Sequence, residues 1–277
     1  MLRMRFARCI LCAALACGAL ACTIQEAPTE LSELNRFLYR EWGVPDETLL
    51  ATGVGNFATV MAAVDIEGSL GDRSFLPELL REEDVQDLER PDRPLENLLG
   101  VAVVHLSPWS TADHARLIVA EDQTPVQPTA PLYQRTFTGT SDPECFLSRD
   151  CRTLMSVNEV RRENLLMSVT FTVFKDYRWV PLDDGDEQAE RWAILSRSWF
   201  TDSFTADNGN STLWQSHTLD FWMDRPDERL LRYQSLWTET EIPGITNPDV
   251  IRGTVRLSLD DTYEAEDDFI EELLEGS

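Results

Sequence analysis

Residues 167–179 of the chain read MSVTFTVFKDYRW. Apolar and polar side chains alternate along most of this stretch, so the apolar ones fall on one face of an extended backbone. Such alternation is typical of a β-strand that buries one face and leaves the other more polar. The stretch lies inside a longer region, residues 132–259, in which similar segments recur.

Short turn sequences separate the strand-like segments of residues 132–259. Asp207-Asn208-Gly209-Asn210 predicts a hairpin, because Asn-Gly accepts the positive φ angles of a type I′ turn. Short connections between long strands indicate an antiparallel β-meander, and strands this long coil into a curved sheet or a closed barrel. The spacing resembles that of lipocalin-like barrels at the level of architecture. The expected strands are 132–139, 152–160, 167–179, 190–204, 212–223, 229–242 and 251–259.

The preceding region, residues 31–131, mixes helical and strand-like patterns. A proline-rich segment at its end predicts an extended linker and a boundary between the two regions. With helices before the meander, the predicted fold class is α+β. The expected elements are helices at 30–42, capped by Thr29, and at 77–89, a helix or buried strand at 58–64, a strand at 98–106 and the linker at 121–131.

The acidic C-terminal segment, residues 260–277, has a different pattern. Nine acids and no base lie between Asp260 and Glu275, while Phe269, Ile270 and Leu273 recur at helical spacing. This pattern predicts a short amphipathic helix over an apolar edge, or a frayed end. A helix that docks on a partner is the alternative.

Residues 1–22 have the features of an export signal. Three arginines precede an apolar run from Cys9 to Leu20, which is shorter than a membrane span. The run ends in Ala19-Leu20-Ala21-Cys22, which resembles the lipobox of bacterial lipoproteins. The resemblance implies lipidation at Cys22, a tether over residues 23–30 and a place in the cell envelope.

The residue after that cysteine is Thr23 rather than Asp, which for a bacterial lipoprotein implies the outer membrane. Two alternatives remain open at the sequence level. Cleavage at the same bond by an ordinary signal peptidase would give a soluble secreted or periplasmic protein, and an uncleaved leader would act as an anchor.

The charge of the chain excludes several classes of function. It carries 49 Asp and Glu against 24 Lys and Arg, a formal net charge of −25, and loss of the leader's three arginines would leave −28. Such a surface repels phosphate backbones and anionic head groups, so we expect no nucleic-acid partner. A hydrophobic content of 43% argues against general disorder.

Only two of the six cysteines, Cys145 and Cys151, lie outside the leader. In an oxidising compartment a pair separated by five residues predicts a disulfide. A redox-active pair would have C-x-x-C spacing, and two cysteines without neighbouring histidines supply half a zinc site.

Motifs for cofactors and metals are weak or missing. Gly53, Gly55 and Ala58 match G-x-G-x-x-A, but no βαβ unit follows, so we interpret the glycines as a turn. Acidic residues 183–187 lack the spacing of a calcium loop and predict a solvated turn; they are Asp183, Asp184, Asp186 and Glu187. We therefore expect neither a cofactor nor a metal.

Candidate catalytic residues are also few. His105, His114 and His217 are dispersed, and no nucleophile elbow or zinc-protease motif is present. Glu239 and Glu241 share one strand face at a separation of about 7 Å, which fits an inverting glycosidase pair. A secreted carboxylate-dependent hydrolase is thus the alternative to a non-enzymatic function.

The aromatic content of the meander is the most unusual feature. Its strands carry aromatic and aliphatic residues on both faces, which indicates that both faces are covered. The six tryptophans are ordinary core residues, the lining of an apolar ligand cavity, or an interaction face. They are Trp179, Trp192, Trp199, Trp214, Trp222 and Trp237. The leading hypothesis is a non-enzymatic envelope lipoprotein that binds an apolar ligand or a protein partner through these strands.

Overall fold

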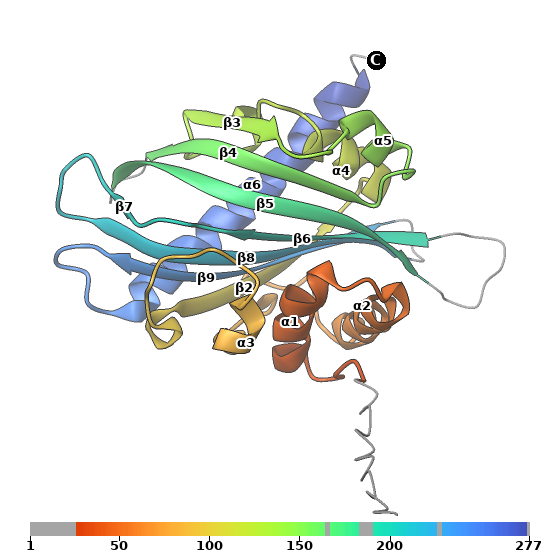
Figure 1. The fold of residues 1–277 in the computed structure, drawn as a ribbon, viewed down its shortest axis with the longest axis horizontal. Coiled ribbons are helices and arrows are strands. Elements are labelled where there is room, and N and C mark those ends of the chain that lie inside the picture. The colour runs from red at the N-terminus through yellow and green to blue at the C-terminus, as the bar shows by residue number, and fades with distance from the viewer. Residues whose placement is uncertain (1–25, 164–166, 183–190, 226–228, 276–277) are drawn as a thin grey trace, which may run out of the picture.

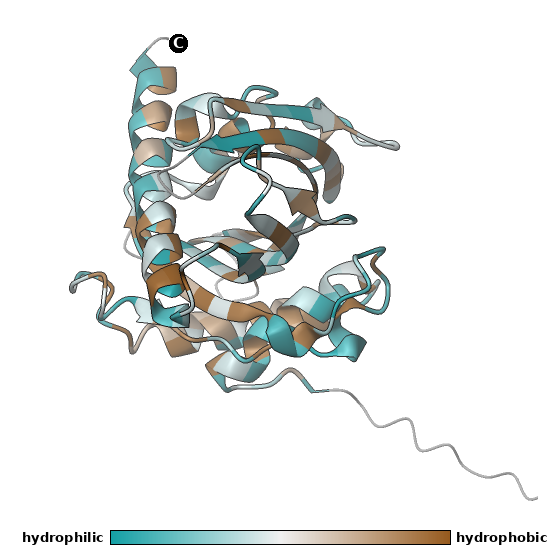
Figure 2. Cartoon of the chain, turned by 90° about the vertical axis from the view of Figure 1, so that its left-hand side faces the viewer, coloured by the Kyte–Doolittle hydropathy of each residue, from teal (hydrophilic) through white to brown (hydrophobic). Residues whose placement is uncertain are grey.

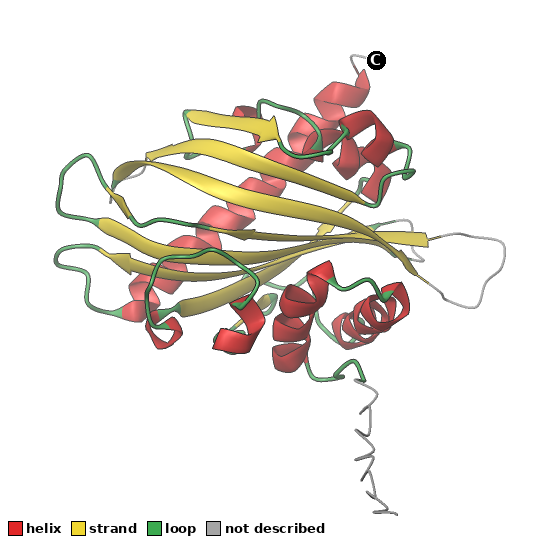
Figure 3. Ribbon diagram, viewed as in Figure 1, coloured by secondary structure: helices red, strands yellow, loops and turns green. Residues whose placement is uncertain are grey.

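The computed structural model describes residues 26–163, 167–182, 191–225 and 229–275. Within them lies an antiparallel sheet with helices on both sides (Figures 1 and 3). The predicted leader, most of the tether and the acidic turn at 183–187 fall outside these residues. The strands are β1 Ser74–Phe75, β2 Leu99–Ser107, β3 Leu132–Phe137, β4 Thr153–Glu163, β5 Ser168–Leu182, β6 Arg191–Trp199, β7 Phe204–Thr205, β8 Thr212–Asp224 and β9 Leu230–Glu241.

Six α-helices and three 3-10 turns complete the described part of the chain. The helices are α1 Leu31–Arg40, α2 Glu47–Met61, α3 Glu82–Val85, α4 Thr111–Ile118, α5 Pro143–Leu147 and α6 Pro248–Glu275. The 3-10 turns are η1 Glu41–Gly43, η2 Leu95–Asn97 and η3 Thr124–Val126. Among the described residues, no helix is long and apolar enough to cross a membrane.

The strand order is β1-β2-β9-β8-β6-β5-β4-β3, with β7 paired to β8. The predicted α+β class and antiparallel meander are confirmed, and of the two expected shapes the sheet is curved and open (Figure 2). Strand β2 comes from the region before the expected linker and pairs with β9 from Leu99↔Thr238 to Ser107↔Leu230. The two regions therefore contribute to one sheet.

The strand expected at 251–259 is wrong, because these residues form the first half of α6. Their β-branched content favoured a strand, but Ile251, Val255 and Leu259 are also spaced four residues apart. That spacing gives one apolar helix face, which packs toward the sheet. Burial of this face overrides the local strand preference, while the expected C-terminal amphipathic helix is confirmed as the second half of α6.

Other local predictions need correction. The helix expected at 77–89 is reduced to α3, and Glu30, without a side-chain cap bond, replaces Thr29 as the cap of α1. In the 207–210 turn only Gly209 has a positive φ, +70°, so the turn is not type I′. Asn208 instead accepts hydrogen bonds from the backbone amides of Asn210 and Ser211.

The glycines of the G-x-G-x-x-A match lie inside α2 rather than in a turn. Gly53 faces α1, where an added Cβ would lie 2.6 Å from Cε1 of Phe37, so close helix packing requires a glycine there. Gly55 has no atom within 4 Å of such a Cβ. The first glycine thus serves packing, and no nucleotide-binding turn is formed.

The two faces of the sheet have different coverings. One face packs against α1 and α2 through the largest apolar cluster, which includes Phe57, Phe221 and Tyr233. The opposite, concave face lies toward α6 (Figure 2). Helix α6 packs on strand β2 through Tyr263 and, seven residues later, on η3 and α4 through Ile270. It therefore spans the concave face from one edge of the sheet toward the other.

Candidate functional site

A cavity of about 210 Å³ lies between the concave face of the sheet and the N-terminal half of α6. It is larger than the roughly 150 Å³ apolar cavity that holds benzene in an engineered protein. Strands β4, β5, β8 and β9 and helix α6 contribute most of its apolar lining. Three more apolar residues lie directly beside strands: Met167 before β5, Phe200 after β6 and Ile242 after β9. The complete apolar lining is Val160, Met167, Phe171, Val173, Phe200, Leu213, Leu236, Ile242, Ile251, Val255 and Leu259.

Strand periodicity explains which residues line this cavity. Along β9, Gln234, Leu236 and Thr238 face it, whereas the alternate residues Tyr233 and Trp237 pack toward the N-terminal helices. Strand β9 thus supplies one row of side chains to the cavity and the other row to the larger core. The roof is supplied by the face of α6 described above.

The cavity changes character along its length. Toward the β7 end, an aromatic group formed by Phe171, Phe200 and Phe204 packs with ring centroids 5.1–6.1 Å apart. Toward the centre of the sheet, hydroxyl and charged groups replace the rings, and the Ser198 hydroxyl is hydrogen bonded to that of Thr218. Apart from Arg162, which also lines the β7 end, a bound molecule would meet an apolar end and a polar end.

A buried ionic network closes the polar end. Lys175, the single lysine of the chain, pairs with Asp220 at 2.7 Å. Asp220 is fully buried and also lies 3.4 Å from Arg232, which is 3.2 Å from Glu266 of α6. Two cations and two carboxylates therefore balance, as buried charges require.

The network also fixes the protonation state of Lys175. Burial lowers the pKa of the Lys175 ammonium, but the Asp220 carboxylate outweighs burial and raises the pKa above its ordinary value. The amine is charged and paired, so it is neither a nucleophile nor a base. Its role is to form the polar end wall of the cavity.

None of the six tryptophans lines the cavity. Trp179, Trp192 and Trp222 form a second buried cluster farther along the concave face, against α4 and α5. Trp237 belongs to the core on the opposite face, where its Nε1 donates to the carbonyl of Glu78 at 2.8 Å. The structure does not bring the tryptophans together as one face.

The other two tryptophans are partly exposed. Trp199 stacks on Phe174 with centroids 5.8 Å apart, and the Arg93 guanidinium lies 4.4 Å from the Trp214 ring. Both faces of the meander are covered, as the sequence indicates. The cavity is lined instead by Phe, Leu, Ile, Val and Met residues, whose contribution the sequence analysis missed. The four-residue spacing of Ile251, Val255 and Leu259 was the available sequence signal for the helix that covers the cavity.

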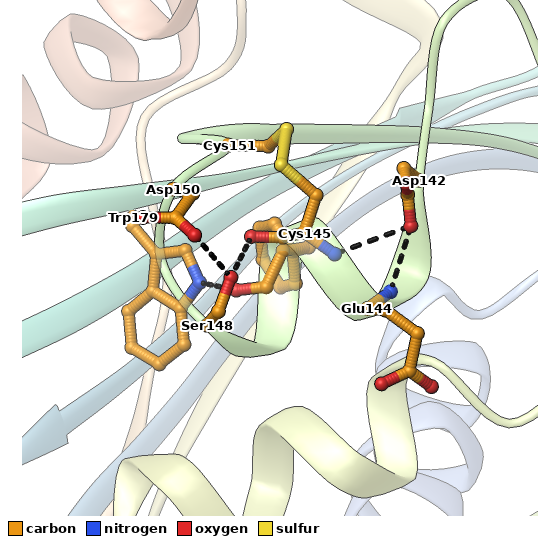
Figure 4. Close-up of a disulfide and its surroundings, with 8 residues drawn as sticks. Asp142, Glu144, Cys145, Ser148, Asp150, Cys151 and Trp179 are labelled. Atoms are coloured by element: carbon orange, nitrogen blue, oxygen red, sulfur yellow. Dashed lines mark hydrogen bonds between the residues drawn. A yellow bond between two sulfur atoms is a disulfide. The ribbon is translucent and has the colours of Figure 1, made fainter.

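The disulfide between Cys145 and Cys151 is present (Figure 4). Cys145 lies in α5, whose first turn is capped by the Asp142 carboxylate through the amides of Glu144 and Cys145. The carbonyl of Phe146 accepts a 2.8 Å hydrogen bond from Nε1 of Trp179. The bridge therefore supports the tryptophan cluster and lies apart from the cavity.

The two glutamates of the hydrolase hypothesis have separate surroundings. Glu239 accepts hydrogen bonds from Asn97 and Gln215 and pairs with Arg93. Burial raises the pKa of Glu239, and these donors outweigh it, so the pKa lies below its ordinary value. Glu241 is exposed and accepts from Nε1 of Trp214 at 3.2 Å. Neither glutamate lines the cavity under α6, and a paired Glu239 with a lowered pKa is not suited to act as a general acid.

Two of the three histidines meet around Asp267 of α6. His105 Nε2 lies 2.8 Å from one carboxylate oxygen, and Ser107 donates to the other at 2.5 Å. His114 Nε2 lies 2.9 Å from the Ser107 hydroxyl. Although the group contains serine, histidine and aspartate, Ser107 is fully buried and bonded directly to the carboxylate. Its geometry holds α6 against β2 and α4 and offers no access to a substrate.

Potential metal ligands do not gather in the part of the chain that the structure describes: no group of three or more His, Cys, Asp or Glu side chains is placed to hold an ion. A more open depression of about 410 Å³ lies over α3, between Glu78 and Glu96. Its lining consists of four charged residues and three leucines, whereas eleven apolar side chains line the more enclosed cavity under α6, which is therefore the better candidate for a ligand site.

Neither a known protein family nor a curated protein matches this sequence. Some solved structures are similar in part. TTHA0849 from Thermus thermophilus has 10% identity and a TM-score of 0.40 over 63% of this chain and 98% of its own.

A second structure, Ara h 8.0201, has 13% identity and a TM-score of 0.36 over 63% of this chain and 99% of its own. A third is the human StarD13 lipid transfer and protein localization domain. The last has 11% identity, a TM-score of 0.33 and coverage of 61% and 75%. Likenesses of this size assign no family.

Proposed function

We propose that this protein binds an apolar small molecule in the cavity between α6 and the curved sheet. The observation that carries the proposal is the lining. Eleven apolar side chains, from four strands, one helix and three positions directly beside strands, converge on a space that the chain itself leaves unfilled. Apolar pockets with a few placed polar groups are the usual form of small-molecule sites.

A binding role fits the rest of the site better than catalysis does. Lys175 is paired with Asp220, and neither Glu239 nor Glu241 lines the cavity. A protein partner docking on the tryptophans has less support, because four of the six are packed inside the chain.

A neutral fluorescent probe, N-phenyl-1-naphthylamine, tests this proposal. We expect saturable fluorescence enhancement with the purified chain at a stoichiometry near one. Leu236→Trp places a larger side chain on the cavity floor and should weaken probe binding. Leu257→Trp makes the same change on the outer face of α6, where Leu257 is 58% exposed, and should leave it unchanged. Equal probe affinity in both variants, or no binding at all, would refute the proposal.

We also propose that the protein works in the cell envelope, tethered through a lipid on Cys22. The support is the leader sequence and its Ala19-Leu20-Ala21-Cys22 end. Two or more acyl chains hold a protein stably on a membrane, since each buried methylene contributes about 0.8 kcal/mol. Cys22→Ala should move the protein from the membrane to the soluble fraction, and unchanged membrane association would reject the assignment.

A further inference from the structure

An unpaired guanidinium lies at the apolar end of the cavity. Arg162, near the end of β4 that is farthest from α5 in Figure 1, contributes to the lining together with Tyr133 and Gln127. The backbone amide of the next residue, Glu163, donates to the carbonyl of Thr129 at 2.7 Å. This bond holds the segment that carries Gln127 beside the end of β4.

Arg162 has no acceptor among the described residues. Its Nε is buried without a hydrogen-bond partner, and no carboxylate of the described chain forms an ion pair with it. Burial lowers the pKa of the Arg162 guanidinium, but an arginine remains charged at any physiological pH. Arg162 as a whole is partly buried and its Nε has no acceptor, so a counter-charge from outside the chain would stabilise the guanidinium.

The nearby acids are already used on the outer face of the sheet. The neighbouring Arg161 donates to Glu163 at 2.6 Å and to Asp207 at 2.8 Å. Because adjacent strand residues point to opposite faces, these carboxylates pair with Arg161 and leave Arg162 alone on the cavity side.

The second cation of the lining shows the contrast. Lys175 at the polar end is neutralised by Asp220, and that network balances internally. Of the described lining residues, Arg162 alone presents a charge without a partner. One uncompensated positive charge matches a monoanion such as a carboxylate.

We propose that the ligand is a carboxylate-bearing amphiphile, whose head group pairs with the Arg162 guanidinium while its apolar part occupies the cavity. This inference rests on the proposed function. The planar guanidinium can donate two parallel hydrogen bonds to a carboxylate, which gives the contact a defined geometry as well as a charge. In a chain of net charge −25, which repels anions in general, an isolated arginine also supplies the local attraction that such a ligand needs.

Two ligands of matched length test the proposal: decanoate and the neutral 1-decanol, each competing against bound N-phenyl-1-naphthylamine at pH 7. The native chain should bind decanoate about tenfold or more tightly than decanol, the range expected for a charge-assisted hydrogen bond. Arg162→Gln should abolish this preference, so that decanoate and decanol displace the probe from the variant with equal affinity. Arg161→Gln, which changes the outward neighbour, should keep it.

The outcomes separate the two proposals. If the probe binds but the native chain does not prefer decanoate, or if Arg162→Gln retains the preference, the carboxylate inference is overturned and the apolar cavity stands. If the probe does not bind, the proposed function fails first. A thermal melt of ligand-free Arg162→Gln checks folding, and we expect a Tm equal to or above that of the native chain, because an unpaired charge has been removed.

Discussion

Two buried histidines make the fold sensitive to mild acid. His217 and His114 are each about 1% exposed, and burial, aided by a nearby arginine in each case, lowers the pKa of each imidazole to about 3. In the unfolded chain a histidine titrates near pH 6.5. Between these two values the unfolded state binds protons that the folded state excludes, so stability is full above pH 6.5 and falls as the pH decreases toward 3.

The size of the effect follows from proton linkage. Lowering the pH from 7 to 5 should cost about 2 kcal/mol for each histidine. Asp176 acts in the opposite direction, because burial raises its pKa to about 6 and the folded state then takes up a proton as the pH falls through that value. The contribution of one histidine is therefore measured as a difference between the native chain and a variant.

His217→Asn is the first variant, because the asparagine amide can replace Nδ1, which lies 3.0 Å from the Tyr39 hydroxyl. His114→Gln replaces the Nε2 that contacts Ser107. Urea unfolding followed by tryptophan fluorescence at pH 7, 6 and 5 gives the free energy of unfolding. Each variant should lose about 2 kcal/mol less than the native chain between pH 7 and 5. Parallel pH curves for all three proteins would refute the argument from buried neutral histidines.

Three further comparisons, each made by denaturant unfolding, test the disulfide, the buried ionic network and the contact between α1 and α2. Replacing Cys145 and Cys151 together by alanine should cost about 2 kcal/mol, the loop-closure value for so short a ring, and stability independent of reductant in the native chain would contradict the bridge. Asp220→Asn should cost about 3–5 kcal/mol, because it leaves buried cations unpaired, and a loss below 1 kcal/mol would show that the network is not buried in solution. Gly53→Ala should destabilise by about 1–3 kcal/mol through a clash, whereas Gly55→Ala in the same helix should stabilise by roughly 0.5–1 kcal/mol; equal effects would exclude the close helix contact.

The meander could be predicted from sequence because its signals are local. The alternation that begins at Met167 and the turn residues at 207–210 each depend on a few neighbouring residues, and the strands appear close to the expected bounds. The Cys145–Cys151 pair was equally local. The segment 251–259 was mispredicted because its side chains fit both a strand and a helix, and only the curved sheet beneath it decides between them.

The site itself could not be predicted for a related reason. Lys175, Asp220 and Arg232 come from three strands and meet only through the sheet register, while Glu266 reaches them from α6. Arg162 differs from Arg161 in the face it occupies and not in its chemistry. The tryptophans attracted attention because they are rare and large, yet four of the six pack in buried clusters and none lines the cavity.

Helix α6 has a consequence for the order of events during synthesis. Asp267 meets His105 and Ser107 about 160 positions earlier in the chain, and the roof of the cavity lies entirely between Ile251 and Leu259. Contacts of such long range form only after both segments are available. A chain that is made or transported N-terminus first therefore has no roof over this cavity until residues 251–259 emerge, so the proposed ligand could be enclosed only after that step.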